Sequence, residues 1–158
     1  MTREGAPDRP SRPRAVLFAC GMNSVRSPMA AALAREMLPR ALHVGSAGVR
    51  KGELDPFAVA AMAEIGIDIG QHQPMTFEEL EDWDGLDFDL IISLAPEAHH
   101  KAIELTHRLA AEVEYWPTAD PTAIEGNREQ RLDAYRAVRD QLMERLRARF
   151  AGQRSGNE

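Results

Sequence analysis

AVLFACGMNSVRSPMA, residues 15–30, joins the pattern of a buried strand to the start of a helix and contains the only cysteine of the chain. The unbroken apolar run 15–19 is typical of a strand that is buried on both faces. Ser27 can cap the following helix, and Pro28 can take its first position. Cys20 is therefore expected just past the carboxyl end of a strand.

The rest of the chain repeats this alternation of strand and helix. Further strands are predicted at 41–47, 88–94 and 113–116, and further helices at 55–66, 76–80, 96–109 and 128–150. Four strands that alternate with helices predict an α/β fold, in which helices cover both faces of a parallel sheet. Such sheets bind ligands outside the carboxyl ends of their strands, which is where Cys20 is expected.

Length and composition limit the possible classes of protein. A chain of 158 residues with 44% hydrophobic residues predicts one domain, at 14–150, between tails at 1–13 and 151–158 that we expect to be disordered. The net charge of -6 argues against nucleic-acid and anionic-membrane partners. The single cysteine excludes a disulfide framework and a multi-cysteine zinc site. With no secretory signal visible, we expect a soluble cytoplasmic protein with a reduced thiol and no metal or cofactor.

The residues after Cys20 have the composition of a phosphate-binding loop. The loop that this pattern predicts consists of Gly21, Met22, Asn23, Ser24 and Val25, followed by Ser27. Its backbone N–H groups could converge on an oxyanion at a helix N-terminus, where Arg26 adds a planar fork of donors. A hydrogen bond from Ser27 would favour the thiolate. A thiolate behind a bound phosphate is set for in-line attack and a phosphocysteine intermediate.

Hydrolysis of this kind also needs an acid for the leaving oxygen, and Asp120 in TADPT is the candidate. Asp120 follows the last predicted strand and would share the sheet edge with Cys20. The alternative interpretation is an ordinary Asp-Pro turn, as expected for Asp55, which precedes Pro56 and reads as a helix cap. An arginine six positions after a lone cysteine can likewise arise by coincidence.

Five segments together resemble the low-molecular-weight protein tyrosine phosphatases and the related thioredoxin-type arsenate reductases. In order, they are CGMNSVRSP (20–28), GSAGV (45–49), IGIDIGQHQ (65–73), FDLIISL (88–94) and YWPTADP (115–121). The resemblance extends over about 14–150. It implies a three-layer α/β/α sandwich of flavodoxin-like topology, with a four-stranded parallel sheet in the order 2-1-3-4.

The resemblance also implies roles for individual residues. Cys20 would be the nucleophile, Arg26 the clamp on the oxyanion, and Asp120 the acid that later acts as base.

A second group of residues would shape the loop. Asn23 matches an asparagine that holds the phosphate loop in an unusual backbone conformation, and asparagine tolerates positive φ better than most residues. Ser46 and His72 match residues that hydrogen-bond to this asparagine, and Ser27 matches the serine that stabilises the thiolate.

The chain departs from the family pattern at three positions. Met22 stands where the family has glycine, and its side chain would crowd the loop if that position required positive φ. Val25 replaces a second cysteine and removes a local disulfide partner for Cys20. Thr122 replaces the usual aromatic residue, so the pocket for a phosphotyrosine ring loses one wall.

Three functions follow from these residues. The first is a phosphomonoesterase acting on a phosphorylated protein, through phosphotyrosine, or on a small aryl phosphate. The second is an arsenate reductase, which would need an external thiol because the chain has no second cysteine. The third is a non-catalytic binder of phosphate or phosphoprotein, which Met22 motivates.

Overall fold

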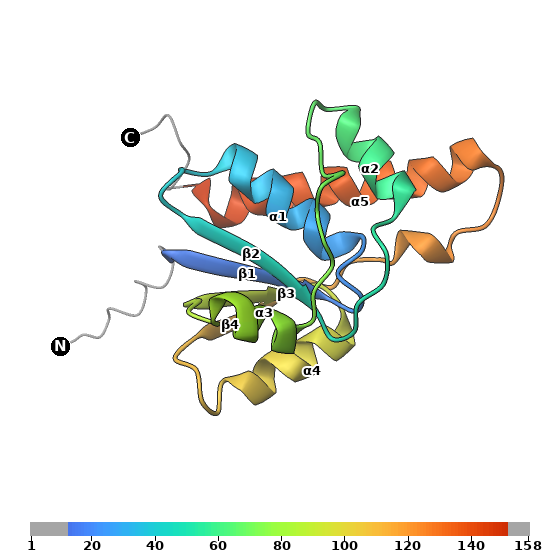
Figure 1. Ribbon diagram of the computed structural model, residues 1–158. Helices are drawn as coiled ribbons and strands as arrows, with labels where there is room; N and C mark the ends of the chain where they lie inside the picture. The colour runs from blue at the N-terminus through green and yellow to red at the C-terminus, as the bar shows by residue number, and fades with distance from the viewer. Residues whose placement is uncertain (1–12, 152–158) are drawn as a thin grey trace.

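A computed structural model describes residues 13–151 and shows a single parallel sheet between two layers of helices (Figure 1). The strands are β1 (Ala15–Cys20), β2 (His43–Gly48), β3 (Leu90–Ser93) and β4 (Glu112–Tyr115). They run in the order β2-β1-β3-β4, and every neighbouring pair is parallel. The predicted fold class and strand order are therefore confirmed. The predicted disordered tails, apart from residues 13 and 151, lie outside the described residues.

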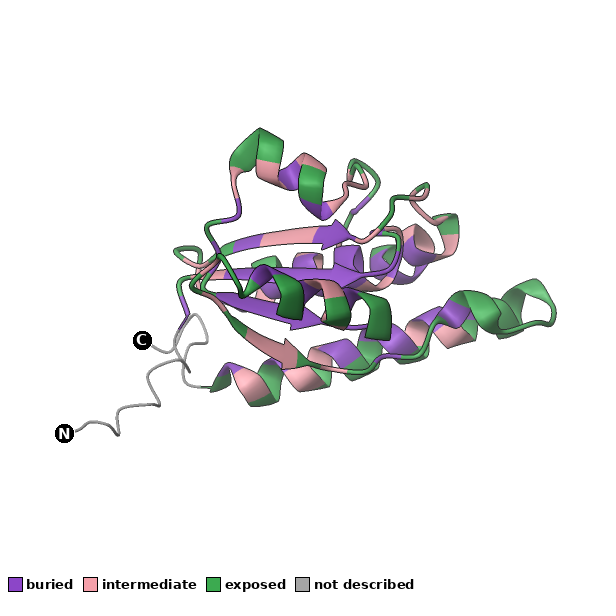
Figure 2. Ribbon diagram, turned by 90° about the horizontal axis from the view of Figure 1, so that it is seen from below, coloured by how far each residue is buried: buried purple, intermediate pink, exposed green. Residues whose placement is uncertain are grey.

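The helices divide between the two faces of the sheet. They are α1 (Arg26–Met37), α2 (Pro56–Ala63), α3 (Phe77–Asp84), α4 (Pro96–Leu105), α5 (Arg128–Arg149) and the short 3-10 turn η2 (Pro121–Ala123). One buried cluster joins alternate residues of β1 to α1, α2 and α5, and a second joins the intervening residues of β1 to α3 and α4. The inner strand β1 is buried at every residue after Ala15, and Figure 2 shows this stretch in purple.

This two-sided packing explains the unbroken apolar run of β1. Val16 and Phe18 face the cluster with α1 and α5, whereas Leu17 and Ala19 face the cluster with α3 and α4. All four side chains are fully buried. Because successive side chains of a strand point to opposite faces, a strand covered on both sides is apolar at every position.

The start of α1 differs from the prediction. Ser27 does not cap the helix, and Pro28 is not its first residue, because α1 begins at Arg26. The hydroxyl of Ser27 instead lies within hydrogen-bond distance of Cys20 and Asn23. Pro28 is tolerated at the third helical position because the first turn of a helix does not use its N–H groups within the helix.

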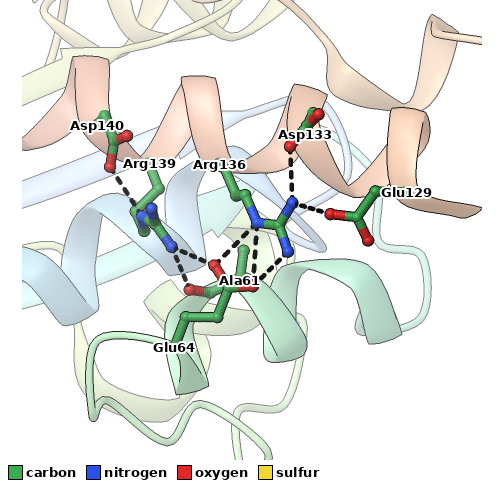
Figure 3. Close-up of polar contacts among 7 residues, drawn as sticks. All are labelled: Ala61, Glu64, Glu129, Asp133, Arg136, Arg139 and Asp140. Atoms are coloured by element: carbon green, nitrogen blue, oxygen red, sulfur yellow. Dashed lines mark hydrogen bonds and ion pairs between the residues drawn. The ribbon is translucent and has the colours of Figure 1, made fainter.

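An ion-pair cluster fastens α2 to α5 (Figure 3). Glu64, just after α2, accepts hydrogen bonds from Arg136 at 2.6 Å and from Arg139 at 2.9 Å. Arg139 is buried and also donates to the carbonyl of Ala61 at 2.7 Å. Hydrogen bonds from the two arginines lower the pKa of Glu64 from its ordinary value of 4.5 to about 2. Glu64 thus serves as a charged acceptor that joins the two helices.

We expect Glu64→Gln to lower the melting temperature at neutral pH. The pKa of Glu64 is lower in the folded state than in the unfolded chain, so this stabilisation is complete above about pH 5 and declines as the pH falls toward 2. The difference in melting temperature between wild type and variant should therefore shrink between pH 5 and pH 3, as followed by circular dichroism.

The matched control is Glu144→Gln, which removes only an exposed pair with Arg147 on α5. A Glu64→Gln difference that stays constant across this pH range would contradict the assignment.

Candidate active site

The segment that follows β2 holds the carbonyl groups of the loop after Cys20. Backbone N–H groups of this segment donate hydrogen bonds to four carbonyl groups of the loop. The pairs, donor first, are Val49 and Cys20 (3.3 Å), Arg50 and Gly21 (2.9 Å), Gly52 and Met22 (3.0 Å), and Asp55 and Ser24 (3.2 Å). The carbonyl of Asn23 lies 3.2 Å from Nε2 of His72. Five successive carbonyl groups of the loop are thus engaged on its outer side.

This arrangement determines where the N–H groups of the loop point. The peptide bonds of the described residues are all trans, and in a trans peptide the N–H points opposite to the preceding carbonyl. The N–H groups of residues 21, 22, 23 and 25 are therefore turned away from the segment 49–55, and the N–H of Ser24 is turned away from His72. Consecutive N–H groups on one side of a tight loop form an anion-binding nest, and α1 adds the positive end of its dipole.

Asn23 is the conformational centre of the loop. Its φ is 56°, and among residues 13–151 no other non-glycine residue has positive φ. Its fully buried side chain donates to Oγ of Ser27 at 2.8 Å and of Ser46 at 3.0 Å, and accepts from the N–H of Met75 at 2.9 Å. These three contacts fix which end of the amide is oxygen and hold the left-handed backbone in place.

His72 supports both the backbone and the side chain of Asn23. Its Nε2 lies 3.2 Å from both the carbonyl oxygen and Oδ1 of Asn23, and because both atoms are acceptors, Nε2 carries the hydrogen. Burial lowers the pKa of His72. The ring is therefore mostly neutral at pH 7 and can donate this shared hydrogen bond. The structure places Ser46 and His72 against Asn23, as the resemblance implied.

Two donors of Ser27 face the sulfur of Cys20. Oγ of Ser27 lies 3.0 Å from Sγ, and the backbone N–H of Ser27 lies 3.4 Å from it. Because Oγ already accepts a hydrogen bond from Asn23, its own hydrogen is free to point at the sulfur. Hydrogen-bond donors directed at a buried sulfur at a helix N-terminus are an arrangement that stabilises a thiolate.

Arg26 and Asp120 meet beside Cys20 in a pocket of about 120 Å³. The pocket is lined by Cys20, Met22, Ser24, Val25, Arg26, Asp120 and Thr122. The mostly buried guanidinium of Arg26 donates to the carbonyl of Thr118 at 2.9 Å and lies 3.9 Å from Oδ2 of Asp120. Thr122 donates to the other oxygen, Oδ1, through its N–H at 3.0 Å and its hydroxyl at 2.7 Å. Asp120 is therefore held by one oxygen and presents the other to the pocket.

Two residues that support the loop were not among the predicted site residues. A Cβ at Gly48 would lie 2.5 Å from the carbonyl of Arg50 and 2.8 Å from the N–H nitrogen of Asn23, so only glycine lets β2 pass this close to the loop. Asp55 caps α2, as predicted, but also accepts a hydrogen bond from the hydroxyl of Tyr135 at 2.6 Å. Gly48 lies in GSAGV, one of the segments that resemble the family. No pattern near Asp55 in the sequence predicted its contact with Tyr135.

None of the three departures from the family pattern places a non-glycine residue at positive φ. Met22 lies outside the left-handed region, and its side chain, 43% exposed, points out over Gly52 at the rim of the pocket. Val25 is buried directly before α1. Thr122 orients Asp120 instead of supplying a ring. The crowding that the sequence suggested at Met22 therefore does not occur.

A family model for the low molecular weight phosphotyrosine protein phosphatases matches residues 15–154. The chain belongs to this family. An arsenate reductase of Bacillus licheniformis is 35% identical over 139 residues, which cover 87% of this chain and 95% of that protein.

Two solved structures extend the comparison. An arsenate reductase in its phosphate-binding state has a TM-score of 0.68 and 29% identity, and the match covers 89% of this chain and 98% of that one. A YwlE arginine phosphatase mutant with a phosphorylated active-site serine has a TM-score of 0.67 and 27% identity, with 87% and 93% covered. The chain is thus similar both to proteins named as arsenate reductases and to one named as an arginine phosphatase.

Within residues 13–151 there is no cluster of histidine, cysteine and carboxylate side chains suited to a metal ion. No helix in the same range is long and apolar enough to cross a bilayer.

The conformation of Met22 leads to a stability prediction. Glycine at position 22 would relieve no strain and would add freedom to the unfolded chain, so Met22→Gly should be less stable than Met22→Ala by about 0.4–1 kcal/mol. The alanine variant is the matched control, because both substitutions remove the side chain that covers Gly52. Urea unfolding checks the difference, and a glycine variant more stable than the alanine variant would mean that this position prefers positive φ.

Proposed function

We propose that the protein hydrolyses phosphomonoesters through a phosphocysteine on Cys20, with aryl phosphates and phosphotyrosine in proteins as substrates. The observation that carries this proposal is the meeting of Cys20, Arg26 and Asp120 in one small pocket of a chain with a single cysteine. Those three side chains and water suffice for a complete catalytic cycle. A neighbour named as an arginine phosphatase with a phosphorylated active-site serine supports a covalent route.

In the first step, the sulfur of Cys20 attacks phosphorus from the side opposite the leaving oxygen. The S–P bond forms as the P–O bond to the leaving group breaks, and Asp120 transfers its proton to that oxygen. The N–H groups of residues 21–25 and the guanidinium of Arg26 stabilise the charge on the three remaining phosphate oxygens. The partly exposed carboxyl group of Asp120 suits this role, because the leaving group departs toward solvent.

In the second step, water cleaves the phosphocysteine. Asp120, now ionised, accepts a proton from the attacking water, the S–P bond breaks, and the thiolate of Cys20 returns with inorganic phosphate as product. The hydrogen bonds from Ser27 to the sulfur make Cys20 a better leaving group in this step. No second thiol takes part, which is consistent with Val25 in place of the family's additional cysteine.

Arsenate reduction is the second candidate, and the names of the curated relatives favour it. Cys20 would attack arsenate and displace hydroxide to form an S–As bond. Two equivalents of an external thiol would then be oxidised to a disulfide while As(V) is reduced to As(III), because the chain has no further cysteine to do this. The same N–H groups and Arg26 would hold the arsenate oxygens.

The proposal is tested by steady-state turnover of aryl phosphates. Wild type should hydrolyse p-nitrophenyl phosphate, and Cys20→Ser should abolish turnover because the nucleophile is lost. Asp120→Ala should slow phenyl phosphate about 10²–10⁴-fold, and should slow 2,4-dinitrophenyl phosphate much less, because that leaving group needs no proton.

Unchanged turnover in Cys20→Ser would refute the phosphocysteine route. If the wild type binds phosphate but releases no phenol, the protein is a binder and not an enzyme of this type.

The arsenate arm uses the same purified proteins. Arsenate-dependent oxidation of glutathione or mycothiol, with and without a glutaredoxin, should depend on Cys20 if the second candidate holds. Its absence at all thiol concentrations would eliminate arsenate reduction.

A further inference from the structure

Two arginines at the start of α5 lie against one aromatic ring. The guanidinium carbon of Arg131 is 4.7 Å from the ring centre of Phe57, and that of Arg128 is 5.6 Å from it. The ring of Phe57 also stacks on Tyr135, with 5.3 Å between the ring centres. Both arginines are exposed to solvent. An arginine that stacks on a ring keeps the N–H groups at its edge available for an oxyanion.

The carboxylates next to these arginines along α5 are already engaged. Glu129 and Asp133 both bind Nη1 of Arg136 at 2.6 Å, and Figure 3 shows the two acids turned toward that guanidinium. Within residues 13–151, no carboxylate pairs with Arg128 or Arg131. Two unpaired cations therefore lie side by side on a chain whose net charge is -6.

Neither Arg128 nor Arg131 is placed where a positive charge stabilises α5. Arg128 is the first helical residue and Arg131 the fourth, at the end of the helix where the dipole is positive and cations are disfavoured. Each arginine contacts the half-buried ring of Phe57 with its guanidinium open to solvent, and such a contact offsets this cost only modestly. The positions of the two arginines thus favour a role in binding an anion.

Hydrogen bonds connect the ring beneath the arginine pair to the phosphate loop. Phe57 donates its N–H to Asp55, and the N–H of Asp55 donates to the phosphate loop at Ser24. Tyr135 stacks on the same Phe57 ring and donates its hydroxyl to the second oxygen of Asp55 at 2.6 Å. The aromatic ring that holds the arginine pair is therefore connected through Asp55 to Ser24, which lines the pocket.

We propose that Arg128 and Arg131, held against Phe57, form a second anion-binding subsite that recognises acidic side chains flanking the phosphorylated residue of a peptide substrate. The subsite rests on the proposed phosphatase function, because the reacting phosphate occupies the loop at Cys20 while a carboxylate of the same peptide reaches the arginines. The subsite would add substrate affinity at a pocket where Thr122 replaces the aromatic residue that would contact a phosphotyrosine ring.

The test compares two phosphotyrosyl peptides, one flanked by glutamates and one flanked by glutamines. At low salt, the kcat/KM of the wild type should be about three- to tenfold higher for the acidic peptide, as expected for two exposed charge pairs. This ratio should fall toward one at about 1 M salt, because salt screens exposed charges. In Arg128→Gln/Arg131→Gln the ratio should be near one at low salt, while turnover of p-nitrophenyl phosphate stays unchanged.

Two controls accompany this variant. Arg128→Lys/Arg131→Lys keeps both charges and should retain most of the preference. Arg147→Gln, which removes one positive charge near the far end of α5, should keep the wild-type ratio.

An unchanged ratio in the double glutamine variant overturns the subsite, as does an equal loss of activity with both peptides. A preference confined to small aryl phosphates that carry a carboxylate overturns the assignment to peptides. If wild type turns over no phosphate ester, the proposed function fails separately. Fluorescence anisotropy of the two labelled peptides with the wild type then decides the subsite, and equal affinities would overturn it.

Discussion

The left-handed backbone of Asn23 is the constraint on which the candidate site depends. The loop turns its carbonyl groups outward and its N–H groups inward, and within residues 13–151 Asn23 is the one non-glycine residue with the positive φ that such a turn uses. That conformation is held by a fully buried amide which contacts Ser27 of α1, Ser46 of β2 and Met75. The strain at one position is thus balanced by hydrogen bonds from three parts of the chain.

The fold places these parts where the loop needs them. Cys20 ends the inner strand β1, which has β2 on one side and β3 on the other, and α1 begins six residues after Cys20. The segment from β2 to α2 covers the outer side of the loop, and the α2–α5 ion pairs keep that segment near α5. Asp55 connects the loop to α5, because its N–H donates to the carbonyl of Ser24 and its carboxylate accepts from the hydroxyl of Tyr135.

Local patterns sufficed for much of this arrangement. The apolar run of β1, the strand–helix alternation and the resemblance of CGMNSVRSP predicted the sheet, its order and the residues that surround the pocket. The same patterns misplaced the start of α1. Serine is a common N-cap residue, but the hydroxyl of Ser27 lies against the sulfur of Cys20 and does not cap the helix. Contacts such as Tyr135 with Asp55, 80 residues apart, carry no local signal, since they depend on how α5 packs on α2. The conformation of Met22 also required the structure, because only the backbone shows which residue takes positive φ.

Binding of inorganic phosphate, followed by amide NMR, tests the central claim that Asn23 organises a preformed oxyanion site at Cys20. In the wild type, the amide signals of residues 21–25 should shift together with one dissociation constant. In Asn23→Ala, with Cys20 and Arg26 unchanged and the signals of the sheet retained, these shifts should be lost. Phosphate binding of wild-type strength in Asn23→Ala, or shifts confined to residues outside the loop, would contradict the account.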